Sequence, residues 1–517
     1  MFRSVTDTYD AVVIGAGHNG LVCAAYLARS GLRTLVLDAG DRIGGACVTE
    51  SPWPGYRIST ACHTVANFGP QIVRDLRLDL PLVRRDPHHF SPAPGGGGIT
   101  WWQDVERSKE EIAHFSRDDA DGYYRMMELF DTAAKHMRTL LGYPATKRQV
   151  MRALRLSGIE KLYRKVIGRS VADACREFLE SDIVQGAVAS SGVVGSSAGP
   201  ETAGTSYMLL QSRLGTTGSA GVRGGLGTLT ELLADAVRSA GGEIRTGAEV
   251  GSVKLAGRRA AGVVLTNGDE FDADVVCSSA DPKRTVSFVP PEAFIKEFIE
   301  DVSLLPTDGA VAKVNCALGV LPRFAGVEGD DVHRSSITVA PSIGYLEASC
   351  RAAAGGRVPE ELLCKVVFES VGDPTMAPDG KHTMSVVAQY VPSDGDDRDA
   401  VGDAVLATLE RYARGLSRTV EHRQVLLPRD LEERFGMTGG HIYHGEMLPD
   451  WLFDNRPANG WNRYRTPLPG LYFCGAGSHP GGGVSGMPGR NAARAVLADR
   501  VAAGTHVPGS APGRAAV

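Results

Sequence analysis

The chain of 517 residues carries 55 lysines and arginines against 60 aspartates and glutamates, for a formal net charge of −5. This near balance excludes a protein that is basic throughout and binds nucleic acid by overall charge, and the hydrophobic fraction of 43% excludes disorder over most of the chain. The 63 glycines amount to about 12% of the residues, against a usual value of about 7%. Clustered glycines favour close approach of the backbone to a ligand.

A membrane-spanning segment is not expected, because no run of about 18 apolar residues occurs. The apolar stretch 11–28 is interrupted by His18 and Asn19 and follows two aspartates rather than a cationic region, so it is not a secretory signal. The nine cysteines include no Cys-x-x-Cys, which argues against a zinc ribbon and a redox dithiol. We therefore expect a cytoplasmic protein.

The N-terminal segment is predicted to form a βαβ unit. Residues 10–14 are a short apolar strand, residues 21–30 have helical character, and residues 33–37 are a second strand. Gly31 suits the residue after the end of the helix, where a left-handed conformation is common.

A glycine-rich turn joins the first strand to the helix, and it consists of Gly15, Ala16, Gly17, His18, Asn19 and Gly20. In this pattern the first glycine allows the tight turn, the second lets the backbone reach a pyrophosphate, and the third permits close packing of helix and strand. Asp38 follows Gly20 by 18 residues, the spacing of a carboxylate that accepts hydrogen bonds from a ribose. The turn predicts a dinucleotide site, with an ordinary βαβ turn as the alternative.

A second glycine loop follows directly after Asp38. It contains Arg42, Gly44, Gly45 and Ala46. Paired glycines would bring this loop close to the dinucleotide, and Arg42 is predicted to lie near the phosphates or the ribose. A simple turn is the alternative.

Residues 118–190 are predicted to be largely helical, because no strand pattern interrupts them. Within them, residues 147–169 hold eight lysines and arginines against one acidic residue, Glu160, with apolar residues between the cations. A basic amphipathic segment can rest on an anionic bilayer. Weak peripheral contact with a membrane is therefore one interpretation, and a solvated charged face packed on the domain is the second.

The rest of the chain returns to mixed α and β patterns. A helix is predicted at 229–240 and a β-hairpin at Asn267-Gly268. Further predicted elements are the strands 311–318, 361–369, 383–390 and 471–474 and the helix 490–502.

The domain organisation follows from these patterns. One nucleotide-binding domain is assembled from the dispersed segments 1–84, 216–288 and 465–505. The segments 85–215 and 289–464 form a second, substrate-binding region, and 506–517 is predicted to be a disordered tail.

The last strand runs into a stretch dominated by glycine, which includes Gly475, Gly482, Gly483 and Val484. Main-chain N–H groups and a helix N-terminus in such a stretch can lie against an electron-rich ring, and at a flavin they stabilise the anionic reduced ring. A flexible linker is the alternative, which the flanking strand and helix disfavour.

Together the three motifs resemble those of FAD-dependent oxidoreductases of the phytoene desaturase and flavin amine oxidase superfamily. The resemblance rests on VVIGAGHNGLVCAAYLARSGLRTLVLDAGDRIGGA and LYFCGAGSHPGGGVSG, near the two ends of the chain. Within the superfamily the chain is similar to the phytoene desaturase-related group named pyridine nucleotide-disulfide oxidoreductase domain-containing protein 2, through stretches such as TGGHIYHGEM. A second complete Gly-x-Gly-x-x-Gly is missing from the C-terminal motif, so a separate nicotinamide domain is not expected.

The resemblance implies an α/β fold, in which a doubly wound, Rossmann-like FAD-binding domain from dispersed segments faces a mixed-sheet and helical substrate region. It also implies that Val250 offers its backbone at the adenine. Lys313 corresponds by this resemblance to the lysine that holds a water near the flavin in amine oxidases. The alternative is a lysine on a strand edge that points to solvent.

The segment 438–447 supplies the remaining catalytic candidates. His441 follows two glycines at the place where some amine oxidases bind the flavin through a cysteine, and it is predicted to lie near the ring. Alternation along a regular strand would place His444 and Glu446 on the opposite side, so they are predicted to form a supporting pair, or a polar structural pair without a role in catalysis. The same alternation disfavours a metal site here, and none is predicted.

We predict an FAD-dependent dehydrogenase or desaturase, in which hydride leaves a substrate C–H bond for flavin N5 and a base or water takes the proton. The partner is expected to be a small or lipid-like molecule, apolar or cyclic, and not nucleic acid; oligomerisation is left open. A flavin amine oxidase is the alternative enzyme. The same motifs are also compatible with a flavin-binding interaction protein without turnover and with a redox-neutral isomerase.

Overall fold

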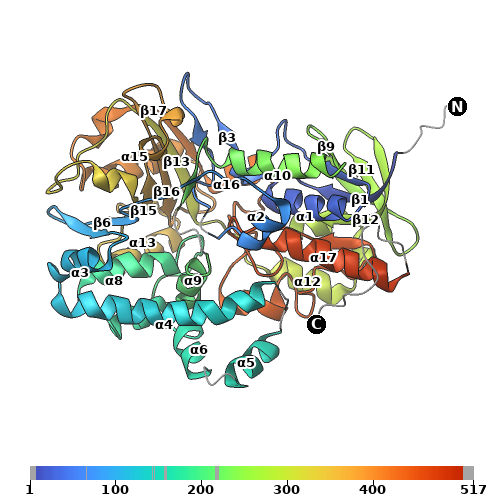
Figure 1. The fold of residues 1–517 in the computed structure, drawn as a ribbon, viewed down its shortest axis with the longest axis horizontal. Helices are drawn as coiled ribbons and strands as arrows, with labels where there is room; N and C mark the ends of the chain where they lie inside the picture. The colour runs from blue at the N-terminus through green and yellow to red at the C-terminus, as the bar shows by residue number, and fades with distance from the viewer. Residues whose placement is uncertain are drawn as a thin grey trace.

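Two seven-stranded sheets organise the chain, and a group of helices lies beside the second sheet (Figure 1). The structure is a computed structural model that describes residues 7–65, 67–142, 144, 146–156, 160–215 and 220–504. The disordered tail predicted at 506–517 lies outside the described residues. Among the described residues, every helix is too short or too polar to cross a bilayer.

The first sheet has the N-terminal strand at its centre and joins segments that are far apart in the sequence. Its parallel part contains β12, β1, β2, β9 and β18, and an antiparallel pair, β10 and β11, extends it. The strand order is β10 (Val250–Leu255), β11 (Ala260–Leu265), β12 (Glu270–Ser278), β1 (Asp7–Ile14), β2 (Thr34–Leu37) and β9 (Glu243–Arg245), with β18 (Leu471–Phe473) beside β12.

Both faces of the first sheet are covered. Successive side chains of a strand point to opposite faces, and Ala11, Val12 and Val13 of β1 are all buried. Ala11 and Val13 pack in a cluster with helices α1 (His18–Arg29), α10 (Gly227–Ser239) and α17 (Met487–Ala502). Val12 packs in a cluster on the other face with Phe298 of α12 (Lys296–Leu304). The sheet is therefore the middle layer of a doubly wound α/β arrangement, as the sequence predicts.

Helix α12 lies within residues 289–464, which the sequence assigns to the second region. Phe298 and Val302 nevertheless share their cluster with Val12 and Phe473 of the first sheet. The domain boundary predicted after residue 288 therefore comes too early, because α12 still packs on the first sheet. The chain reaches the second sheet only after this helix, at β13.

The second sheet is mixed, and only β14 and β6 pair in parallel. Its strands follow the order β17 (Val420–Leu426), β13 (Val311–Leu318), β16 (His382–Gln389), β15 (Leu363–Val367), β14 (Ser336–Val339), β6 (His89–Pro92) and β7 (Gly98–Trp101). One face packs on α15 (Arg398–Glu410) through an apolar cluster that includes Val314, Val386 and Val405. The other face is open to the site described below.

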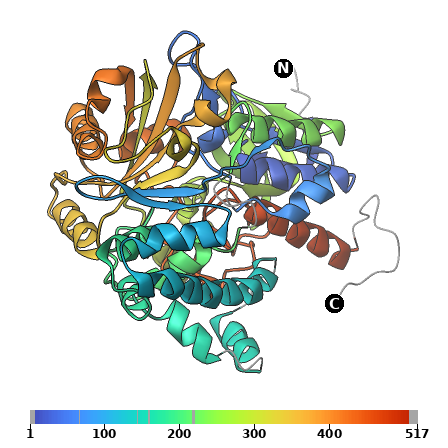
Figure 2. The ribbon, with the colours of Figure 1, turned by 60° about the vertical axis from the view of Figure 1, so that its left-hand side comes forward.

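Figure 2 shows the helices that follow β7 grouped below the second sheet. They share one apolar core, to which Met126, Val150, Val184 and Leu210 belong. The helices are α3 (Val105–Ala113), α4 (Arg117–Leu141), α5 (Lys147–Leu156), α6 (Glu160–Ile167), α7 (Val171–Arg176), α8 (Asp182–Ala189) and α9 (Thr205–Ser212). This is the region that the sequence predicts to be largely helical.

The predicted elements agree with the structure to within a few residues at their ends. Strand β13 has the predicted bounds, and the turn between β11 and β12 contains Asn267 and Gly268, which has a φ of 91°. Strand β15 is shorter than predicted, because helix α14 (Glu369–Gly372) already begins at Glu369.

Candidate active site

A cavity of about 320 Å³ lies where β1 and β2 end and α1 begins. In doubly wound sheets, ligands bind at the carboxyl ends of the strands at such a position. Many of the predicted cofactor residues line this dinucleotide cavity: Gly15, Gly17, His18, Asn19, Asp38, Gly45, Ala46, Val250, Gly483 and Val484.

The three glycines of the first turn have different environments. Gly15 has a φ of 94°, in the left-handed region that favours glycine. A Cβ on Gly20 would overlap the carbonyl oxygen of Gly15, so helix and turn pack closely. Gly17 has an ordinary φ of −70°, and no atom beyond its own residue and the two adjacent ones lies within 4 Å of the position that its Cβ would take. A side chain on Gly17 would therefore enter the dinucleotide cavity.

Asp38 fixes the first turn as well as lining the cavity. One carboxylate oxygen accepts a hydrogen bond from the Ala16 N–H at 2.5 Å, and the other accepts one from Gly40 at 2.8 Å. The second loop rests on the first, since Gly44 donates its N–H to the Ala16 carbonyl at 3.0 Å. Ala16 and Gly44 thus shape the loops that surround the cavity.

Arg42 is not among the residues that line the dinucleotide cavity. Its side chain is 55% exposed and forms an ion pair with Asp41 at 3.3 Å, away from the cavity lining. Arg284 and Arg434 line the cavity instead, from α11 (Pro282–Ser287) and α16 (Pro428–Phe435). Their positions depend on how distant segments fold together, and no local motif in the sequence indicates them.

The C-terminal glycine stretch is ordered against its neighbours. A Cβ on Gly475 would overlap the Ser279 carbonyl oxygen, and one on Gly482 would overlap the side chain of Tyr443. Gly483 has a φ of 95°, which favours glycine. The stretch therefore packs closely against Ser279 and Tyr443, and it is not a flexible linker.

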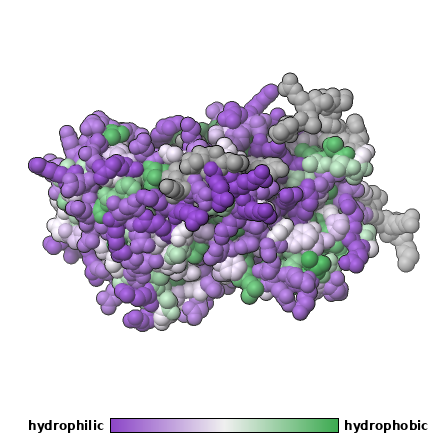
Figure 3. Space-filling view, turned by 90° about the horizontal axis from the view of Figure 1, so that it is seen from below, coloured by the Kyte–Doolittle hydropathy of each residue, from purple (hydrophilic) through white to green (hydrophobic). Residues whose placement is uncertain are grey.

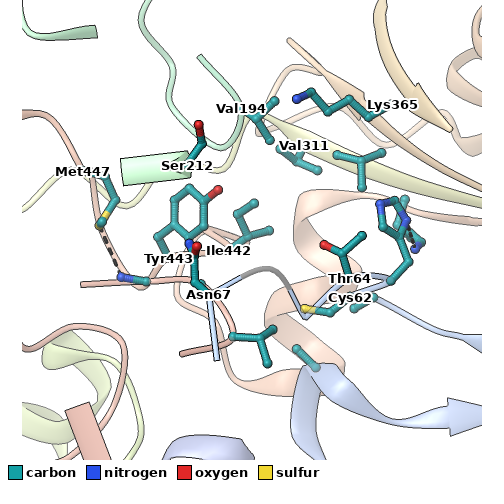
Figure 4. Close-up of a pocket in the computed structure, with 18 of the residues that line it drawn as sticks. Cys62, Thr64, Asn67, Val194, Ser212, Val311, Lys365, Ile442, Tyr443 and Met447 are labelled. Carbon is teal, nitrogen blue, oxygen red and sulfur yellow. Dashed lines mark hydrogen bonds between the residues drawn. The ribbon is translucent and has the colours of Figure 1, made fainter. Parts of the chain in front are cut away.

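A second cavity, of about 290 Å³, adjoins the dinucleotide cavity. Figure 4 shows it between Val194, Val311 and Ile442, with Cys62, Thr64 and Asn67 on another side. We call it the substrate cavity. The two cavities share the lining residues Ala46, Cys62, Met437, Ile442, Tyr443, Gly483 and Val484.

Lys313 lines the substrate cavity and is only 1% exposed, so the solvent-facing alternative is wrong. Its neighbours Ala312 and Val314 pack on the opposite face of the sheet, which directs Lys313 into the site. The ammonium donates a hydrogen bond to His63 Nδ1 at 3.1 Å, and this nitrogen is also 3.0 Å from Ser385 Oγ. Burial lowers the pKa of Lys313 to about 8, although the charge of Glu369 opposes this shift.

The structure places His444 at the dinucleotide cavity, where the sequence predicts His441. His444 lines the dinucleotide cavity, whereas His441 is 1% exposed and lines neither cavity. The reason is that residues 441–446 form turns instead of a regular strand, with φ values of 58° at His444 and 122° at Gly445.

The predicted pair of His444 and Glu446 does not form. Glu446 accepts hydrogen bonds from Ser196 Oγ at 2.9 Å and from the Met447 N–H at 2.6 Å. The turn is held by Arg456, which is fully buried and donates to the carbonyl oxygens of Tyr443 at 2.6 Å and Ala476 at 2.9 Å. Arg456 thus joins the turn to the C-terminal glycine stretch, and sequence reasoning missed it.

Buried polar atoms without partners indicate that the dinucleotide cavity is built for a polar ligand. Asn19 Oδ1 and His444 Nδ1 are buried, line this cavity and have no hydrogen-bond partner among the described residues. Such atoms are costly unless a ligand or water satisfies them. Burial lowers the pKa of His18 to about 4, so this side chain is neutral at pH 7. The glycine turn, the helix N-terminus and these atoms fit a dinucleotide.

Known proteins that resemble this chain include flavin-containing oxidoreductases, which agrees with the presence of a dinucleotide cavity. A model of the family described as flavin containing amine oxidoreductase matches residues 20–497. The rat protein named pyridine nucleotide-disulfide oxidoreductase domain-containing protein 2 is 35% identical over 95% of this chain and 94% of its own length. Phytoene desaturase (neurosporene-forming) of Rhodobacter capsulatus is 26% identical over 93% of this chain and 92% of its own.

A solved structure shows the same fold. An oxidoreductase from Methanosarcina mazei has a TM-score of 0.62 to this chain at 20% identity, and the match covers 94% of this chain and 99% of that one.

Proposed function

The chain belongs to the flavin containing amine oxidoreductase family, and we propose that within this family it is a dehydrogenase or desaturase that acts on a C–H bond of an apolar substrate. The protein is an FAD-dependent oxidoreductase. One observation carries the proposed reaction and substrate: an apolar cavity that contains a buried lysine adjoins the dinucleotide cavity.

FAD fits the dinucleotide cavity through the residues already described. The turn at Gly17 and the N-terminus of α1 would face the pyrophosphate, Asp38 the ribose, and Val250 the adenine. Gly483 and Val484, which line both cavities, would face the flavin ring. When bound, FAD supplies an acceptor for the two electrons of a hydride.

The lining of the substrate cavity favours an apolar molecule over an amine. Its walls include Val194, Val311, Leu431, Met437 and Met447. Among the described lining residues the only aromatic ring besides the imidazole of His63 is that of Tyr443. An aromatic cage that would attract a cationic amine is therefore missing from the described lining.

Lys313 and His63 provide a route for the proton. Removal of two hydrogens from the substrate releases one as a hydride and the other as a proton, and the proton needs a base. A lysine with a pKa of about 8 has an appreciable neutral fraction near neutral pH. Its neutral amine, directly or through a water that it holds, would accept the proton, while the His63 hydrogen bond at 3.1 Å orients it.

Anaerobic mixing of the FAD-loaded protein with polyenes, cyclic ketones and amines tests the proposal. We expect loss of the oxidised flavin absorbance with a polyene or a cyclic substrate and little loss with amines. Reduction by amines alone would favour an amine oxidase. No reduction by any compound of the panel would favour a binding protein without turnover.

The basic segment 147–169 supports a second, weaker proposal, which is contact with an anionic membrane. Figure 3, which looks at the molecule from below, shows a mostly hydrophilic surface with small separate hydrophobic areas. Five of the eight cations already have carboxylate partners: Lys147 with Asp450, Arg155 and Arg164 with Glu160, and Lys165 and Arg169 with Glu177. Any attraction to the membrane must therefore be weak.

We expect low-salt co-sedimentation with anionic vesicles that disappears at high salt, because each cation near such a surface contributes about 1 kcal/mol. Arg148 and Arg152 are exposed on α5, so replacing both by glutamate should abolish the binding. The matched control is Lys296→Glu, at an exposed lysine of α12. Equal and negligible binding to anionic and neutral vesicles would leave the segment as ordinary solvated surface.

A further inference from the structure

A second lysine faces the substrate cavity, and the proposed reaction does not use it. Lys365 of β15 and Lys313 of β13 both lie opposite Val387 of β16, so the three residues form one row across the sheet. Two strand spacings separate the lysine backbones, which is about 10 Å. Cys364 and Val366 pack on the opposite face. Lys365 therefore points to the cavity side, and Figure 4 shows its side chain extended toward Val194.

Lys365 has no counter-ion of its own. Its ammonium lies 3.4 Å from Ser191 Oγ, and among the described residues no carboxylate forms an ion pair with it. Burial lowers the pKa of Lys365 to about 8, and no acidic group opposes that shift. A cation that is withdrawn from water without a partner is costly, and a ligand that brings a negative charge would remove this cost.

The charged side chains that line the substrate cavity are positive. The described lining residues include both lysines and no aspartate or glutamate. Glu369, the acidic group that acts on Lys313, is already engaged, because it accepts a hydrogen bond from Ser59 Oγ at 2.6 Å. The remaining walls are mainly apolar. A cationic ligand would meet repulsion here, whereas an anion attached to an apolar body would meet both an ammonium and matching apolar surface.

We propose that the substrate cavity binds an apolar molecule that carries one carboxylate, and that Lys365 is the counter-ion that recognises it. This inference rests on the proposed function, since it names the substrate class of the same site. Lys365 would set specificity and position, and the redox step would take place at the flavin end of the cavity.

Binding to the FAD-loaded protein tests this inference without any turnover. The probes are decanoate, decylamine and 1-decanol, which share one apolar chain and differ in their head group, and calorimetry measures each Kd. We expect decanoate to bind at least about tenfold more tightly than 1-decanol, a difference of about 1.4 kcal/mol, and decylamine to bind most weakly. Tighter binding of decylamine than of decanoate, or equal Kd values for all three probes, would overturn the inference.

Two variants assign the effect to Lys365. Lys365→Met keeps the apolar stem and should bring the Kd of decanoate to that of 1-decanol, while the Kd of 1-decanol stays the same; Lys365→Gln is the second variant in case the first folds poorly. Lys296→Met, at an exposed lysine of α12 that pairs with Glu300, should behave as wild type. A preference for decanoate that survives in both Lys365 variants would show that this lysine is not the counter-ion.

The binding test of this inference and the flavin reduction test of the proposed function can give different results. If no compound reduces the flavin but decanoate still binds through Lys365, the reaction is wrong and the ligand class is right. If a polyene reduces the flavin while the head group has no effect on binding, the reaction stands and this inference fails.

Discussion

Gly17→Val is expected to yield a folded protein that contains almost no FAD. The backbone φ of −70° suits valine, and no atom beyond residue 17 and its two neighbours in the chain lies within 4 Å of the position of the new Cβ. The added side chain would instead occupy the space that a pyrophosphate needs. Absorbance of the purified protein near the flavin maximum, together with thermal unfolding after treatment with excess FAD, measures both effects.

The matched control is Gly344→Val. Gly344 is exposed on α13 (Ile343–Ala354), and its Cβ would meet only Ser342 Oγ, at an ordinary distance of 3.7 Å. This variant should keep the wild-type FAD content. If Gly17→Val also kept one FAD per chain, the cofactor would not lie on the first glycine turn.

Lys313→Met should slow the anaerobic reduction of the bound flavin by about 10²-fold or more, the usual contribution of a positioned acid or base. Methionine keeps the apolar stem and deletes the amine, so FAD content should not change. In the wild type the rate should rise as the pH passes through about 8, because Lys313 must lose its proton before it can accept another. The variant should lack this rise.

Stopped-flow mixing with the substrate found in the anaerobic panel measures these rates. Lys296→Met serves again as the control, because this lysine is exposed and lies outside both cavities. A Lys313→Met variant that binds FAD and reduces it at the wild-type rate, with the same pH profile, would remove Lys313 from the mechanism.

The local motifs in the sequence identify many of the residues that line the dinucleotide cavity. The turn at Gly17 and the carboxylate of Asp38 belong to one βαβ unit, so their relative positions follow from short-range geometry. Lys313 is found through the resemblance to the amine oxidases, and the structure places this lysine in the substrate cavity. A lysine inside an apolar strand is also costly to bury unless it has a function or a partner.

The same reasoning applies to Lys365, which lies in the apolar run LLCKVVF. Its place in one row with Lys313 cannot be predicted locally, because it depends on the pairing of both strands with β16. Arg456 also has no local signal, since it contacts carbonyl oxygens of two separate segments.

The positions of His441 and His444 cannot be derived from strand alternation, because the segment that carries them is not a strand. Positive φ values at His444 and Gly445 break the alternation on which that prediction depends.

A primary deuterium isotope effect on flavin reduction tests the central claim most directly. The wild-type, FAD-loaded protein is mixed anaerobically with the substrate identified in the panel and with the same substrate deuterated at the reacting carbon. Transfer of hydride from that carbon predicts slower loss of the oxidised flavin absorbance with the deuterated compound. Identical rates for the two compounds, with reduction rather than binding shown to limit them, would contradict the claim that this site breaks a substrate C–H bond.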